Sequence, residues 1–228
     1  MSTAPTPYSA PPLVFPAGWT LAQVQDRLGN VPAERIRVNP PLGTATIDDA
    51  IRLCESKESL CEWVGGILVE KAMGVWESGI AAVLIQLIRN FLDEQPLGFV
   101  AGEAGMLRIL PDRMRIPDVS FIRWERFPDR KLPREAAFRI APDLVVEILS
   151  PGNTKREMEL KLAEYLNAGV QLVWYIEPTT RTAIVHRPGE PARSIDADGM
   201  LDGAGVLPGF TVRLGEIFAR AERGVGGL

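Results

Sequence analysis

Residues 143–149 read Asp-Leu-Val-Val-Glu-Ile-Leu, residues 150–153 read Ser-Pro-Gly-Asn, and residues 154–157 read Thr-Lys-Arg-Glu. The first stretch is an apolar run of strand length, and the second combines residues that end regular structure. The third has a threonine followed three residues later by a glutamate, which is the capping box of a helix start. The sequence therefore predicts a buried strand over 142–149 and a helix over 154–167.

The middle of this strand carries a carboxylate where a carboxylate is costly. A buried and unpaired Glu147 would cost several kcal/mol or become neutral. Residues 116–122, Ile-Pro-Asp-Val-Ser-Phe-Ile, repeat the pattern with Asp118. Strand alternation puts Asp118 on the face of Ser120, and Glu147 on the face of Val145. If the two strands are neighbours, both acids can converge on one divalent cation, and magnesium prefers such oxygen ligands.

The helix that follows carries a lysine beside its apolar face. Lys161 lies three residues after Met158 and four before Tyr165, so its side chain can reach the sheet. Beside a metal-bound water, an ammonium can orient the nucleophile or stabilise phosphate charge. The alternative is a lysine that only covers apolar surface with its aliphatic stem. Lys155, in the first turn, is a second candidate for the same role.

The rest of the chain alternates helices and strands. Residues 76–94 have the apolar spacing of one helix face, with Glu77 at its start, where the helix dipole favours an acid. This order predicts an α/β fold with a mixed sheet and helices on its faces. Further elements are expected as short helices at 20–28, 48–53 and 214–223, a hairpin at 61–71, and strands at 98–101, 105–110, 171–177 and 182–187.

Composition limits the class of protein. Hydrophobic residues make up 46% of 228 residues, which supports a packed core. No apolar run reaches the roughly 18–20 residues of a membrane helix and no export signal stands out, so we expect a cytoplasmic protein without membrane contact. Cys54 and Cys61 are then expected to be reduced thiols, although one disulfide is possible. The net charge of −4 argues against strong nonspecific binding to nucleic acid.

Basic residues gather around Asp118. Residues 108–139 contain nine basic and five acidic side chains. This local excess could attract a phosphate backbone, or it could be an ordinary solvated loop.

The linked motifs resemble those of a known family. Pro117-Asp118, Glu147 to Pro151, Lys161 to Tyr165, Gly169-Val170 and Trp174 are similar to the Uma-type family of restriction-endonuclease-like proteins, in the PD-(D/E)xK nuclease superfamily. The resemblance covers residues 60–220. It implies a restriction-endonuclease-like domain, which we expect over 46–228. The five prolines within residues 1–17 predict an extended start, so residues 1–45 are expected to be a Pro-rich arm with a short helix.

The resemblance also implies a function and a site. It implies an Mg²⁺-dependent endonuclease that hydrolyses DNA, with Mn²⁺ as a substitute ion. Asp118, Glu147 and the carbonyl of Ile148 would hold the metal, and Lys161 would supply the lysine that the strand lacks at Leu149. The resemblance suggests Glu77 as a further acid. A homodimer is expected because cutting a duplex needs two active sites.

Two other functions fit the same sequence. A catalytically inactive binding or scaffold protein could retain the nuclease fold. Serine or cysteine hydrolysis would need His186, the only histidine, but no nucleophile-elbow pattern accompanies it.

Overall fold

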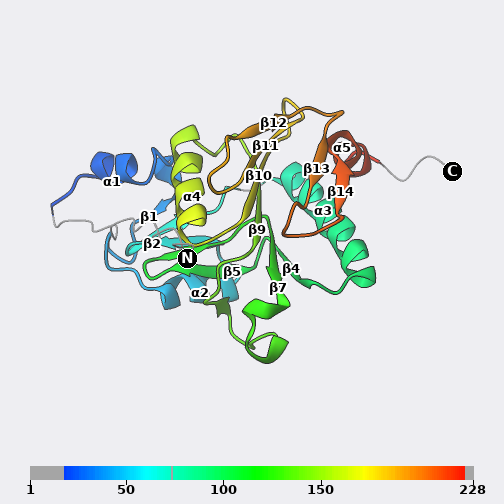
Figure 1. The fold of residues 1–228 in the computed structure, drawn as a ribbon. Coiled ribbons are helices and arrows are strands. Elements are labelled where there is room, and N and C mark those ends of the chain that lie inside the picture. The colour runs from blue at the N-terminus through cyan, green and yellow to red at the C-terminus, as the bar shows by residue number, and fades with distance from the viewer. Residues whose placement is uncertain (1–17, 73, 224–228) are drawn as a thin grey trace.

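The structure is a computed structural model that describes residues 18–72 and 74–223 (Figure 1). Within these residues the helices are α1 Leu21–Arg27, α2 Ile47–Glu55, α3 Val75–Glu94, α4 Lys155–Asn167 and α5 Leu214–Ala221, with short 3₁₀ helices η1 Ala33–Arg35, η2 Trp124–Arg126 and η3 Pro128–Arg130. The strands are β1 Ile36–Arg37, β2 Cys61–Val64, β3 Ile67–Glu70, β4 Gly98–Gly102, β5 Met106–Leu110, β6 Arg113–Arg115, β7 Val119–Arg123, β8 Ala137–Phe138, β9 Leu144–Ile148, β10 Leu172–Glu177, β11 Thr182–His186, β12 Arg193–Ile195, β13 Met200–Asp202 and β14 Thr211–Arg213.

The predicted mixed sheet is present, and a second sheet accompanies it. The first, which we call the large sheet, has the order β12-β11-β10-β9-β7-β4, and only β9 and β10 within it pair in parallel. The second, the hairpin sheet, has the order β1-β3-β2-β6-β5-β8. The expected α/β fold is therefore confirmed, while the hairpin sheet was not anticipated.

Helices cover both faces of the large sheet (Figure 1). On β9, Val146 and Ile148 face a core shared with α3 and α5, whereas Val145 faces a second core shared with α4. The alternation of strand side chains therefore puts Glu147 on the α4 face. On β7, Phe121 belongs to the α3 core and Ile122 to the α4 core. The same alternation places Ser120 and Asp118 on the α4 side.

The chain crosses from one sheet to the other just before Asp118. Strand β6 of the hairpin sheet ends at Arg115, and β7 of the large sheet begins at Val119. The strand expected over 116–123 thus begins three residues later, at Val119, because residues 116–118 form the link between the sheets. Asp118 consequently lies at the junction.

The N-terminal segment from residue 19 packs on the domain. Val24, Leu28 and Ile36 form an apolar cluster with Ile67 and Val69 of β3. The Pro-rich start, residues 1–17, lies outside the described residues, and the domain boundary at residue 45 stays a prediction. Helix α3 is long and apolar enough for a membrane span, but a buried core helix passes the same test.

The two cysteines are free thiols. Cys61 is buried in β2 and Cys54 is half-buried in α2. This agrees with the expectation of reduced cysteines.

Candidate active site

Asp118 is held at the sheet junction by two contacts. Strands β7 and β9 pair antiparallel, with Val119 opposite Val146, so the neighbouring-strand expectation is confirmed. The N–H of Ile148 donates to Oδ2 of Asp118 at 2.6 Å, and Nζ of Lys71 lies 2.8 Å from its Oδ1. The aspartate is nearly buried, at 7% exposure. It therefore faces a cation from the hairpin sheet and a backbone donor from the large sheet.

Glu147 lies beside Asp118 in an almost fully buried position. The hydroxyl of Tyr165 donates to its Oε1 at 2.5 Å, and Nζ of Lys161 lies 3.6 Å from the same oxygen. Burial raises the pKa of Glu147, and the negative charges of Asp118 and Glu62 raise it further. The positive charges of Lys161 and Lys71 lower the pKa and offset part of this rise. The two acids thus interact, as convergence on one site requires.

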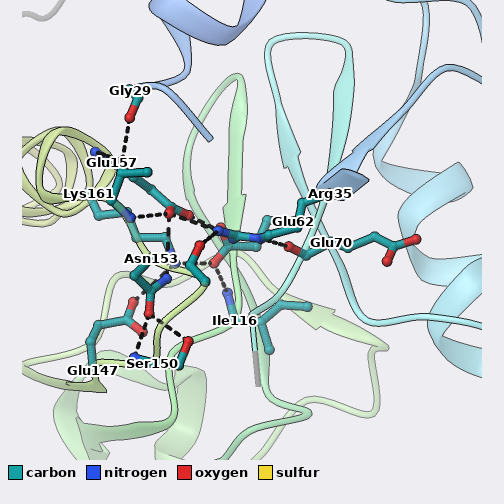
Figure 2. A network of polar contacts seen from close by, with 12 residues as sticks. Gly29, Arg35, Glu62, Glu70, Ile116, Glu147, Ser150, Asn153, Glu157 and Lys161 are labelled. Carbon is teal, nitrogen blue, oxygen red and sulfur yellow. Dashed lines mark hydrogen bonds and ion pairs between the residues drawn. The ribbon is translucent and has the colours of Figure 1, made fainter. Parts of the chain in front are cut away.

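Lys161 points from α4 into the sheet and not into solvent (Figure 2). Its ammonium lies 3.0 Å from Oε1 of Glu62, and its side chain is 3% exposed. Burial alone would lower the pKa of Lys161, but the charges of Glu147 and Glu62 raise it above its usual value. The ammonium therefore stays charged, and the alternative of a lysine that covers surface is wrong.

Glu62 is a central residue that the sequence interpretation missed. It lies on β2 with no exposed surface and accepts from Lys161 and, at 2.6 Å, from Nη1 of Arg115. Burial would raise its pKa, but the Lys161 and Arg115 charges lower the pKa to about 2. The signal existed, because an acid inside the apolar run Leu60 to Val64 repeats the pattern of Glu147.

Two arginines of β6 extend the network. Arg115 also pairs with Glu164 of α4 at 2.6 Å, and Arg113 contacts the same carboxylate at 2.7 Å. Both arginines are buried. For these two members of the basic stretch at 108–139, the solvated-loop interpretation is therefore wrong.

Lys71 was missed because its sequence context is ordinary. It follows the acidic last residue of β3, as many solvated strand ends do. Its side chain is nevertheless 3% exposed and paired with Asp118. Only the approach of the hairpin sheet to β9 creates this contact, so no local pattern could have shown it.

Other candidates lie apart from this network. Lys155 is exposed and pairs with Glu159 within α4, and His186 packs edge-on against Tyr175. Glu77 is half-buried in the first turn of α3, the helix on the opposite face of the large sheet. Among the described residues, no hydrogen bond or ion pair joins Glu77 to Asp118 or Glu147, and its role stays a prediction.

The donors at the junction suit a magnesium ion. The described residues contain no cluster of three or more metal-binding side chains of the Asp, Glu, His and Cys types. Magnesium, however, commonly uses only one or two carboxylates and completes its shell with water and substrate phosphate. Asp118 and Glu147 supply two carboxylates that already interact electrostatically. The residues therefore fit the ion if the ammonium of Lys71 moves away from Asp118 when the ion binds.

Comparison with known proteins agrees with this geometry. A family model described as "Putative restriction endonuclease" matches residues 47–215, which include every residue of the network. The chain belongs to the Uma2 family. A crystal structure described as a putative nuclease belonging to DUF820 from Anabaena variabilis is 24% identical to this Uma2 chain, with a TM-score of 0.64. The match covers 72% of this chain and 92% of that one, and at this identity it supports the fold alone. No curated protein matches the chain.

Proposed function

We propose that this Uma2 protein is a metal-dependent endonuclease that hydrolyses DNA phosphodiester bonds, with Mg²⁺ as cofactor and Mn²⁺ as a substitute. One observation carries the proposal. Two buried carboxylates that interact electrostatically lie side by side, because Asp118 directly precedes β7 and Glu147 lies on the paired strand β9, and a buried lysine lies 3.6 Å from Glu147. Phosphoryl-transfer sites combine acids that hold a metal with a cation that stabilises phosphate charge.

Each side chain has a separate task in this proposal. Asp118 and Glu147, helped by the Ile148 carbonyl, would hold the cation, which when bound supplies an activated water and polarises the phosphate. In the metal-free protein the negative charges of Glu147 and Glu62 raise the pKa of Lys161 and favour the charged ammonium. Its task is to orient the water and to stabilise negative charge. Glu77, in the first turn of α3, would assist a second metal or the water network.

A catalytically inactive binding protein is the second candidate, and one observation favours it. Both acids already have cationic partners, Lys71 for Asp118 and Lys161 for Glu147. A network that is neutral without metal can be purely structural. The two functions differ in whether the protein binds Mg²⁺ and cuts DNA.

The direct test is cleavage of supercoiled and linear DNA with MgCl₂ or MnCl₂, with and without excess chelator. Wild type should cut only with the metal. Asp118→Asn should lower the rate by at least about 100-fold because a charged metal ligand is lost. The matched control is Asp143→Asn. Asp143 is also a buried aspartate, but it lies just before the start of β9, at the end away from Glu147, and pairs with Arg126.

Lys161→Met separates binding from chemistry. It should retain Mg²⁺ binding while losing turnover, whereas Lys155→Met on the exposed side of α4 should change neither. Equal cleavage by wild type, Asp118→Asn and Lys161→Met would contradict the proposed site. No cleavage of any DNA by a folded wild type would favour the inactive protein, whereas cleavage that persists with excess chelator would contradict the metal-dependent mechanism. Sedimentation of the wild type would test the expected homodimer.

A further inference from the structure

The ammonium of Lys71 is buried beside Asp118 and has unused hydrogen-bond donors. Its backbone N–H donates to the carbonyl of Leu60, so the end of the hairpin fixes where the side chain starts. Nζ lies 2.8 Å from Oδ1 of Asp118 but has no hydrogen bond of acceptable geometry to any described residue. An ammonium has three donors, and leaving them unused inside a protein is costly. The side chain therefore has capacity for another acceptor.

Lys161 lacks that freedom. Its ammonium lies between Glu62 and Glu147, at 3.0 and 3.6 Å. Glu62 is fixed in turn by Arg115 at 2.6 Å. A shift of Lys161 toward a substrate would leave a fully buried carboxylate short of a partner, which is strongly unfavourable.

Lys71 pairs with one of the two carboxylates that would hold a divalent cation. It contacts Asp118, and its charge also acts on Glu147. A cation attracted by the same two carboxylates would repel the ammonium at short range. Lys71 would then need another anion, and a substrate phosphate could supply it, since magnesium commonly completes its shell with substrate phosphate.

From this geometry we propose that Lys71 is a substrate-contacting lysine: it holds Asp118 in the metal-free protein and donates to a non-bridging oxygen of the scissile phosphate once the cation takes that carboxylate. The inference rests on the proposed function. A lysine is a compact, mobile point charge that suits both partners in turn.

The first test observes Lys71 directly in the wild-type protein. The ammonium signals of ¹⁵N-labelled lysine side chains are followed by NMR during addition of MgCl₂, and then of a short DNA duplex with CaCl₂ in place of MgCl₂ to prevent cleavage. Lys71→Arg identifies the signal. We expect it to move with the metal and again with the DNA, while the Lys161 signal moves less. A Lys71 signal that responds to neither addition would overturn the inference.

The second test compares Lys71→Met, Lys71→Arg and the control Lys155→Met. Lys71→Met should bind Mg²⁺ about tenfold more tightly in calorimetry, because the competing charge is gone, and a tenfold change is about 1.4 kcal/mol. Its kcat should fall by about 100-fold, with a smaller change in KM, since the lost contact stabilises developing charge. Lys71→Arg should recover part of kcat. If Lys71 had a purely structural role, Lys71→Met would change the stability of the protein but neither its Mg²⁺ affinity nor its kcat.

These outcomes separate the two proposals. If wild type neither binds Mg²⁺ nor cuts DNA, the proposed function and this inference fail together. If wild type does both, while Lys71→Met keeps its Mg²⁺ affinity and kcat within twofold of wild type, only the inference fails.

Discussion

At the scale of single residues, the site consists of buried charges that neutralise one another. Burying one charge alone costs several kcal/mol, so each acid needs a cation close by. The network contains four acids and four bases: Glu62, Asp118, Glu147, Glu164, Lys71, Arg113, Arg115 and Lys161. Removing one member should therefore affect stability, and not only chemistry.

Glu62→Gln tests this network through pH. The folded pKa of about 2 lies below the ordinary 4.5 of a glutamate. A depressed pKa contributes stability that is present above pH 4.5 and is lost as the pH falls toward 2. That difference corresponds to about 3 kcal/mol. Urea unfolding of wild type should show this loss between pH 4.5 and 2, and Glu62→Gln should lack it and be less stable at pH 7.

The control for that experiment is Glu58→Gln, because Glu58 is 57% exposed in its side chain and pairs only at the surface with Arg37. It should keep the pH dependence of wild type. If Glu62→Gln lost as much stability between pH 4.5 and 2 as wild type, the carboxylate of Glu62 would not be held by the buried cations.

At the scale of elements, β9 and α4 carry most of the site residues that the sequence could predict. The acid of β9, the capping box of Thr154 and Glu157, and the inward lysine all lie between Glu147 and Lys161 and depend on local patterns. The hairpin sheet was only partly predictable. Strands β1, β6 and β8 have two or three residues each, too few for a periodic signal, and they exist through pairing with distant segments.

Arg35 is the link between the N-terminal segment and α4. It donates to both carboxylate oxygens of Glu157 at 2.9 and 2.8 Å, and to the carbonyls of Glu70 and Gly152 (Figure 2). Glu157 also completes the capping box of α4. One guanidinium thus connects η1, the end of β3, the loop after β9 and the first turn of the helix that carries Lys161.

Arg35→Met should therefore destabilise the protein by about 3–5 kcal/mol, since it leaves Glu157 buried without its cation. Chemical denaturation gives the change in free energy of unfolding. Arg52→Met is the control, because Arg52 is 72% exposed and pairs within one turn of α2, so its loss should cost less than about 1 kcal/mol. A similar small effect of both substitutions would show that the N-terminal segment is not anchored through Arg35.

At the scale of the whole molecule, the large sheet separates a chemical face from a packing face. The acids and Lys161 lie on the α4 side, at the junction with the hairpin sheet. The other side buries an apolar core with α3, α5 and the β13–β14 hairpin (Figure 1). Sequence periodicity predicted this division within β7 and β9, but not that a second sheet would supply Glu62 and Lys71, because that depends on the path of the chain between sheets.

Phe210→Ala tests whether the two faces are independent. Phe210 lies between β13 and β14 and is 5% exposed. Its ring meets Phe91 of α3 edge-on, with centroids 5.5 Å apart, and stacks on Trp174 of β10 at 6.4 Å. Truncating it should cost about 3–5 kcal/mol of stability because a cavity opens in the core. The exposed Val38→Ala, at 66% exposure, should cost almost nothing.

Because the cavity would open on the side away from Glu147, the site should keep its geometry while the protein stays folded. Calorimetric Mg²⁺ affinity of Phe210→Ala, measured well below its unfolding temperature, should stay within about twofold of wild type, as expected for distant sites without shared partners. The same should hold for the rate of DNA cleavage per folded molecule. A large loss of Mg²⁺ affinity in a variant that circular dichroism shows to be folded would mean that the α3 core sets the position of β7 and β9, and that packing and chemistry are coupled through the sheet.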